Sequence, residues 1–141
     1  MGAILFREPT EAELEVVKKY VHEYWLDDEG VDKKQFKILL YEGKLAAFGR
    51  IKEHKDSIEL CTVGVVEKYR GKRLGEELVK RFLSEIKQEV YLVTVIPSFF
   101  NRLGFKEAKK YPASIREKCD RCGNKYHVDE SYVVMRYAPH I

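Results

Sequence analysis

The sequence is short of cysteine, of long apolar runs and of excess charge, and each shortage excludes a class of protein. Three cysteines among 141 residues are too few, and odd in number, for the disulfide framework of a small secreted domain. No apolar run approaches the roughly 18 residues that a membrane-spanning helix needs. The 26 basic and 23 acidic side chains give a formal net charge of +3, which provides no argument for a nucleic-acid partner.

Internal repeats, low-complexity tracts and linkers rich in proline, glycine or serine are also missing. The first residues contain neither a basic leader nor a long apolar region, so we expect no signal peptide. What is present is 45% apolar and 35% charged residues, the composition of a globular protein with a charged exterior. We therefore expect a single domain over residues 1–141, located in the cytoplasm and without a membrane partner.

The apolar pattern predicts a mixed α/β fold around one sheet. The expected strands cover residues 3–8, 36–41, 45–51, 57–66, 90–96, 105–110 and 131–137. The expected helices cover residues 10–25, 74–86 and 97–103. Residues 111–129, which contain a CxxC motif, are expected to form an irregular loop.

The junction between the strand at 57–66 and the helix at 74–86 has the composition of an anion site. Gly71 and Gly75 allow close approach of the backbone, and a helix N-terminus offers free amides and partial positive charge. Four cations stand within six residues: Lys68, Arg70, Lys72 and Arg73. The junction therefore fits either a pyrophosphate site or a basic helix start whose glycines serve only the turn.

Two segments resemble those of a known family. Residues 63–83 (VGVVEKYRGKRLGEELVKRFL) resemble the acetyl-CoA signature of the GNAT N-acetyltransferases, in which a strand is followed by Arg/Gln-x-x-Gly-x-Gly/Ala and a helix. Residues 99–105 (FFNRLGF) resemble the later FYxxLGF segment of that family. The expected element order from residue 3 to 137 is also similar. The resemblance implies the GNAT fold, one central mixed sheet flanked by helices, and an enzyme that transfers acetyl from acetyl-CoA to a primary amine by direct attack in a ternary complex.

The resemblance also implies roles for individual residues. Val63 and Val65 would pair with the pantetheine arm, and the Val65 amide would stabilise the oxyanion. Two positions depart from the family: Arg73 stands where glycine is usual, and Phe100, in the cofactor region, replaces a frequent tyrosine that can protonate the leaving thiolate. The pyrophosphate is assigned to the backbone amides of Arg70, Gly71, Lys72, Arg73, Leu74 and Gly75.

Glu59 is the candidate general base. Strict alternation along the strand would place it on the same side as Cys61 and Val63, and several members of the family use a carboxylate, or a water held by one, near this position. The alternative is a solvated or ion-paired carboxylate. Cys61, inside an apolar strand, is expected to be a small buried residue rather than a nucleophile. His54 has no partner visible in the sequence and is expected at the surface.

The CxxC motif, Cys119 and Cys122, has the form of half a zinc site. His127 follows five residues after the second cysteine and could supply a third ligand. A disulfide and two free thiols are the alternatives. A fourth ligand would have to come from a second subunit or from Asp129, Glu130 or His140.

The acceptor amine is suggested by a second, weaker resemblance. The pattern from Tyr111-Pro112 through the CxxC motif to Glu130 and Met135 is similar to the tail of short, single-domain glutamate N-acetyltransferases. An acidic amino acid would require a cation for its carboxylates. The candidates are Arg7, Arg50 and Arg102.

Other acceptors and another class of function stay open at this point. The alternative acceptors are a protein N-terminus, a lysine or a polyamine. Phe100 and Arg73 also fit a non-catalytic sensor of acyl-CoA, and the CxxC segment fits an interaction module. A homodimer paired through the last strands is compatible with the resemblance.

Overall fold

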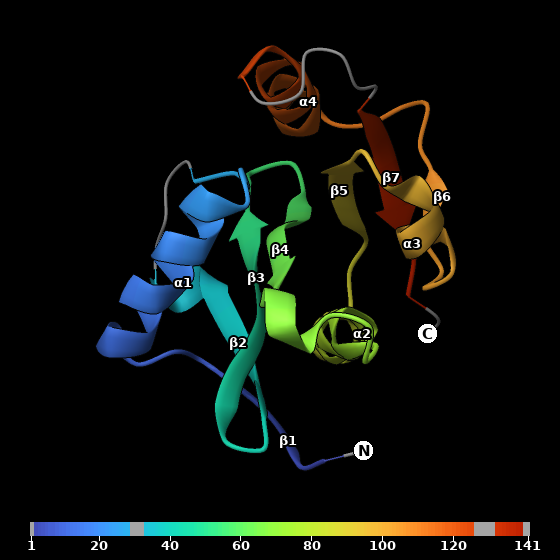
Figure 1. Ribbon diagram of the computed structural model, residues 1–141. Helices are drawn as coiled ribbons and strands as arrows, with labels where there is room; N and C mark the ends of the chain where they lie inside the picture. Colours follow the sequence, from blue (N-terminus) through green and yellow to red (C-terminus); the bar gives the residue numbers. More distant parts are fainter. Residues whose placement is uncertain (1, 29–32, 126–131, 140–141) are drawn as a thin grey trace. The chain divides into compact units, whose positions relative to one another are not determined.

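The computed structural model describes residues 2–28, 33–125 and 132–139, and Figure 1 shows its elements. The strands are β1 (Ile4–Arg7), β2 (Phe36–Tyr41), β3 (Lys44–Glu53), β4 (Ile58–Val65), β5 (Val90–Thr94), β6 (Lys106–Glu107) and β7 (Val133–Tyr137). The helices are α1 (Glu11–Glu23), α2 (Leu74–Glu85), α3 (Pro97–Asn101) and α4 (Ala113–Lys125), with 3₁₀ turns η1 (Lys33–Gln35) and η2 (Glu67–Tyr69).

The strands form one mixed sheet in the order β1-β2-β3-β4-β5-β7-β6. Strands β4 and β5 run parallel, whereas β1 with β2, β2 with β3, and β7 with both β5 and β6 run antiparallel. This arrangement of a mixed sheet with helices confirms the fold class expected from the sequence.

The chain forms two compact units. The first comprises Met1–Ile51 and Thr62–Phe82, and the second comprises Lys52–Cys61 and Leu83–Ile141. Strands β3 and β4 and helix α2 each contribute residues to both units. The core of the first unit lies between α1 and strands β2 and β3 (Figure 1). Its buried members are Leu14, Val17, Val21, Phe36, Ile38, Leu40 and Phe48.

Helix α1 begins at a complete capping box and ends at an exposed tryptophan. The Thr10 side chain accepts the Glu13 amide, while the Glu13 carboxylate accepts the Thr10 amide at 2.8 Å, so two amides of the first turn are satisfied. The helix ends at Glu23 with Tyr24 as its C-cap, and Trp25 follows with a left-handed φ of 56°. The Trp25 side chain is 67% exposed.

In the second unit, β5 pairs with β7 along its whole length, from Val90 opposite Tyr137 to Thr94 opposite Val133. Helix α3 begins at Pro97, whose fixed φ suits the first helical position. Strand β6 contains only two residues, so it is shorter than the strand expected over 105–110. Among the described residues, no helix is long and apolar enough to cross a bilayer.

The expectation of an irregular loop over 111–129 is wrong where the structure describes it, because Ala113–Lys125 form helix α4. The Pro112 carbonyl accepts the amides of Ile115 and Arg116 and so begins the helix. Ile115 is fully buried and anchors its inner face. The CxxC motif therefore lies in a helix, where a zinc knuckle would need a turn.

Candidate functional site

Strand β4 changes conformation at Thr62. This residue has φ of 55°, a left-handed value that is unusual for a β-branched side chain. Residues 59–62 are buried, whereas 63–65 are half-buried. A left-handed residue interrupts the regular alternation of a strand. The strict alternation on which the placement of Glu59, Cys61 and Val63 on one face depended is therefore interrupted between Cys61 and Val63.

Two polar groups of the first unit hold the Thr62 side chain. Its hydroxyl accepts Arg50 Nε at 2.7 Å and donates to the Asp27 carbonyl at 2.8 Å. The Arg50 side chain is fully buried; it also donates to the Asp27 carbonyl at 3.0 Å and lies 3.6 Å from the Asp27 carboxylate. Arg50 is therefore a structural cation inside the first unit, and it is not available to pair with a substrate carboxylate.

Beyond β4, the chain makes the turn that the sequence predicts before α2. Gly71 has φ of 86° with open space where a Cβ would lie, and Arg73 has φ of 61°. The second value explains why a glycine is usual at the position of Arg73, since only glycine adopts it without strain. Arg70 Nε donates to the Val65 carbonyl at 3.1 Å and ties the turn to the end of β4. Leu74 then begins α2 and is buried.

Three of the four cations at this turn lie over tyrosine rings of the same unit. The Arg70 guanidinium is 4.6 Å from the ring centre of Tyr24, and Lys72 Nζ is 6.0 Å from that of Tyr41. Lys68 Nζ lies 5.2 Å from the ring centre of Tyr69. The turn thus combines the N-terminal amides of α2 with positive charge, the combination that binds a phosphate or pyrophosphate.

Glu59 lies in the second unit, and two side chains hold its carboxylate. Its carboxylate is 1% exposed, forms an ion pair with Lys118 of α4, and lies 2.8 Å from His54 Nε2. Burial raises the pKa of Glu59, but the charge and hydrogen bond of Lys118 and the hydrogen bond from His54 outweigh it, so its pKa falls below the usual range. His54 is therefore paired, contrary to the expectation from sequence.

Phe100 is a packed core residue of the second unit. It is 6% exposed, and its ring meets those of Phe99 and Phe105 edge-on, with centroids 4.9 and 5.7 Å away. Edge-to-face contacts of this kind stabilise aromatic clusters. A phenylalanine here supplies packing and no proton donor.

The CxxC residues do not fit a zinc knuckle in the described part of the chain. Cys119 is half-buried on α4. Burial and the negative charge of Asp120 raise the pKa of its thiol, although Lys118 opposes them, whereas zinc binds the thiolate. Cys122 lies three positions along the same helix, and His127 lies outside the described residues. We derive no metal chemistry from this motif.

The remaining arginine candidates differ in their surroundings. Arg7 forms a bidentate ion pair with the Glu13 carboxylate, with N–O distances of 2.7 and 2.9 Å. Arg102 is exposed at the end of α3, with its guanidinium 5.9 Å from the Phe99 ring centre. Of the three arginines that the sequence suggested, Arg102 is the most exposed.

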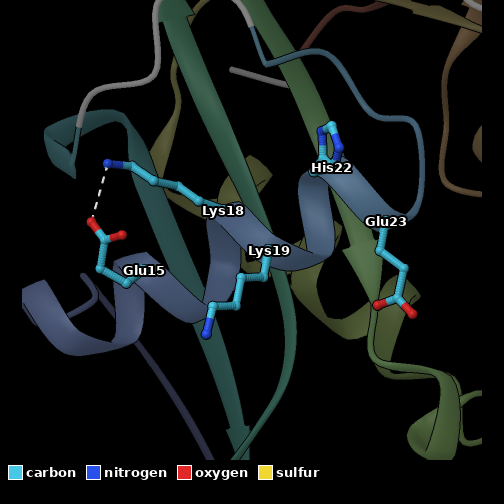
Figure 2. A pocket seen from close by; sticks show the side chains of 5 residues that line it. All are labelled: Glu15, Lys18, Lys19, His22 and Glu23. Atoms are coloured by element: carbon cyan, nitrogen blue, oxygen red, sulfur yellow. Dashed lines mark hydrogen bonds and ion pairs between the residues drawn. The ribbon is translucent and has the colours of Figure 1, made fainter.

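A shallow depression on the outer face of α1 is a separate feature (Figure 2). Lys18 and Glu15, one turn apart, form an ion pair at 3.3 Å there. All its lining residues come from this helix: Glu15, Lys18, Lys19, His22 and Glu23. We interpret it as a solvated helix face, because every lining residue is polar or charged and no second element encloses it.

Comparison with known proteins decides the family. The model of the acetyltransferase (GNAT) family matches residues 3–105, which include β4, the turn and the start of α2. The chain belongs to the acetyltransferase (GNAT) family. A curated relative, an uncharacterized N-acetyltransferase of Chlorobaculum tepidum, is 30% identical over 82 residues, which are 54% of this chain and 53% of the relative. The chain thus matches about half the length of that relative.

Solved structures share the GNAT fold at low identity. N-acetylglutamate synthase from Neisseria gonorrhoeae, in complex with coenzyme A and N-acetyl-glutamate, has a TM-score of 0.78 at 15% identity and covers 100% of this chain and 36% of its own. A Mycobacterium tuberculosis protein in complex with CoA has a TM-score of 0.75 at 19% identity, and the match covers 96% of this chain and 99% of that protein. The ribosomal-protein-S18-alanine N-acetyltransferase of Escherichia coli has a TM-score of 0.66 at 16% identity, covering 99% and 97%.

Sequence reasoning missed the polar networks around the site. The motif pointed to the turn at 70–75, but no local signal marks Arg50 as the partner of Thr62, because the two are twelve residues apart on different strands. Lys118 is likewise 59 residues from Glu59. Only a buried carboxylate in need of a counter-charge hints at such a partner.

Proposed function

We propose that this GNAT protein is an acetyl-CoA-dependent N-acetyltransferase whose acceptor is a small amino acid, glutamate first among them. The observation that carries the proposal is the turn between β4 and α2, where the strand end, left-handed residues and the N-terminus of α2 follow one another within the family match, an arrangement suited to an anion. The amides of residues 70–75 would hold the pyrophosphate. Val63 and Val65 would pair with the pantetheine arm.

The bound acetyl-CoA would supply a thioester whose carbonyl is open to attack by an amine. The Val65 amide would donate to the carbonyl oxygen as negative charge develops there. As the new C–N bond forms and the C–S bond breaks, the amine loses a proton and CoA leaves as a thiolate. With Phe100 in the usual tyrosine position, the thiolate would leave unassisted or be protonated by water.

Glu59 is proposed to assist loss of the amine proton through His54 or water. A buried carboxylate whose pKa is lowered is a weak base by itself, and its ion pair with Lys118 keeps it ionised. Its hydrogen bond to His54 Nε2 leaves Nδ1 as the accepting nitrogen when Nε2 carries the proton. Glu59 would then orient His54, which is more exposed.

Two features support an acidic amino acid as acceptor. The Neisseria gonorrhoeae synthase, solved with N-acetyl-glutamate, shares the fold over the whole chain, and Arg102 presents an exposed cation. The Escherichia coli relative acts on a ribosomal protein, so a protein N-terminus is the alternative acceptor. A cytoplasmic location and a homodimer belong to the same proposal.

The deciding experiment detects acetylated product by mass spectrometry. The protein would be incubated with acetyl-CoA and, separately, glutamate, aspartate, polyamines, a lysine peptide and a peptide with a free N-terminal alanine. We expect product from glutamate. Product from a peptide alone would keep the acetyltransferase and discard the amino-acid acceptor, whereas acetyl-CoA binding with no product from any amine would contradict the proposed catalysis.

A further inference from the structure

Thr62 holds a conformation that its own side chain opposes. Branching at Cβ makes a left-handed φ of 55° strained, and a strand interior supplies no reason for it. Such a residue persists only where its surroundings over-determine it. Its side chain forms hydrogen bonds to Arg50 and Asp27 of the first unit.

The surroundings are a buried polar clamp made of Arg50, Asp27 and Thr62. Their exposed fractions are 0%, 7% and 6%. Arg50 Nε donates to the Thr62 hydroxyl at 2.7 Å, and both Arg50 and Thr62 donate to the Asp27 carbonyl. The guanidinium also donates to Gln35 Oε1 at 3.4 Å and lies 5.7 Å from the Phe36 ring centre.

The conformation of Thr62 sets the direction of the strand end that follows it. Gly64 lies so close to Phe48 that an added Cβ would come within 2.5 Å of that ring, and the Val65 carbonyl receives Arg70 Nε. If Thr62 relaxed to an ordinary extended φ, the side chains of residues 63–65 would move to the opposite faces of the strand. Both of these contacts, and with them the link between β4 and the turn, would be lost.

We infer that Arg50 is a positioning residue for acetyl-CoA: through the Thr62 hydroxyl it holds the left-handed turn in β4 that presents residues 63–65 and the following turn to the ligand. The inference rests on the proposed function. It gives the buried arginine a role other than the carboxylate pairing that the sequence suggested.

The test separates the effect of losing the Thr62 hydroxyl from the effect of strain in the Thr62 backbone. Thr62→Val keeps the shape and the branching but removes the hydroxyl, so the strained φ is no longer held. Thr62→Gly also removes the hydroxyl but adopts φ of 55° without strain. By isothermal titration calorimetry with acetyl-CoA, we expect Thr62→Val to weaken affinity about tenfold and Thr62→Gly to stay within about threefold of the parent protein.

A double-mutant cycle tests Arg50 itself. Arg50→Lys should weaken acetyl-CoA affinity about tenfold in the parent protein and by less than about threefold in the Thr62→Gly background, because glycine no longer needs the clamp. Arg81→Lys, at a half-buried ion pair with Glu77 on α2, is the matched control. Equal affinity for Thr62→Val and the parent protein, or an equal effect of Arg50→Lys in both backgrounds, would overturn the inference.

A second readout needs no ligand and so distinguishes failure of the clamp from failure of the proposed function. Amide hydrogen exchange in the ligand-free protein should be faster at residues 63–66 in Thr62→Val than in Thr62→Gly. If the two variants exchange equally, the clamp does not hold β4. If they differ but the parent protein does not bind acetyl-CoA, the clamp holds the conformation of β4. Its role in acetyl-CoA binding then fails together with the proposed function. Thr62 variants keep the test available should Arg50→Lys fail to fold.

Discussion

Glu59 of the second unit is both buried and charged, and these two properties conflict. A carboxylate that is 1% exposed needs a counter-charge, and Lys118 supplies it. Replacing Glu59 by glutamine would therefore remove the carboxylate charge that faces the buried Lys118 ammonium, and breaking a buried ion pair in this way is strongly destabilising. Activity at this site is better tested at His54, which lies between the carboxylate and solvent.

We expect His54→Gln to lower kcat about 100-fold while the KM for acetyl-CoA stays unchanged. The value of kcat should fall because an amine must lose its proton as it attacks, and a positioned base typically contributes such a factor. The KM should not change because His54 is not part of the proposed acetyl-CoA site. Steady-state kinetics with the accepted amine measure both constants.

His22→Gln is the matched control for that experiment. His22 is an exposed histidine on α1, so its loss should leave both constants unchanged. An unchanged kcat in His54→Gln, with a thermal unfolding midpoint equal to that of the parent protein, would remove His54 and Glu59 from the proposed proton path.

At the scale of elements, α1 offers a clear test of local sequence signals. Thr10→Ala removes the side chain that accepts the Glu13 amide, and we expect the free energy of unfolding to fall by about 1 kcal/mol. Urea denaturation followed by circular dichroism measures it. Glu15→Gln, on the exposed face of the same helix, should change it by less than about 0.5 kcal/mol. Equal effects of the two substitutions would contradict the cap.

The sequence predicts well those elements whose boundaries are marked by a motif of a few neighbouring residues. The capping box predicted the start of α1, and the glycine-containing junction predicted where α2 begins. Helix α4 was missed because the CxxC pattern was interpreted as a metal turn, although Pro112 and the buried Ile115 favour a helix. The left-handed Thr62 has no local signal at all, since the groups that impose it come from distant parts of the chain.

At the scale of the whole molecule, ionised carboxylates predict how stability depends on pH. The Arg7 side chain and the Thr10 amide lower the pKa of Glu13 to about 2, and the pKa of Glu59 is also lowered despite its burial. A carboxyl whose folded pKa is depressed stabilises the protein above its unfolded pKa, about 4.3, and loses this contribution as pH falls through the folded value.

We therefore expect the free energy of unfolding to fall steadily below about pH 4.3, measured by urea denaturation across a pH series. Glu13→Gln should be less stable than the parent protein at neutral pH, and the difference should vanish as the pH approaches about 2. A difference that persists undiminished at that pH would show that the Glu13 charge is not its source.

The exposed end of α1 has an optical consequence. Trp25 is the one tryptophan of the chain and is 67% exposed, so its indole already meets water in the folded protein. Its fluorescence should change little on global unfolding and respond instead to events at its own site. The neighbouring Tyr24 carries the Arg70 guanidinium on its ring and accepts the Glu67 amide on its hydroxyl. An anion that draws Arg70 away would therefore alter the emission of Trp25 while the circular dichroism of the fold stays constant.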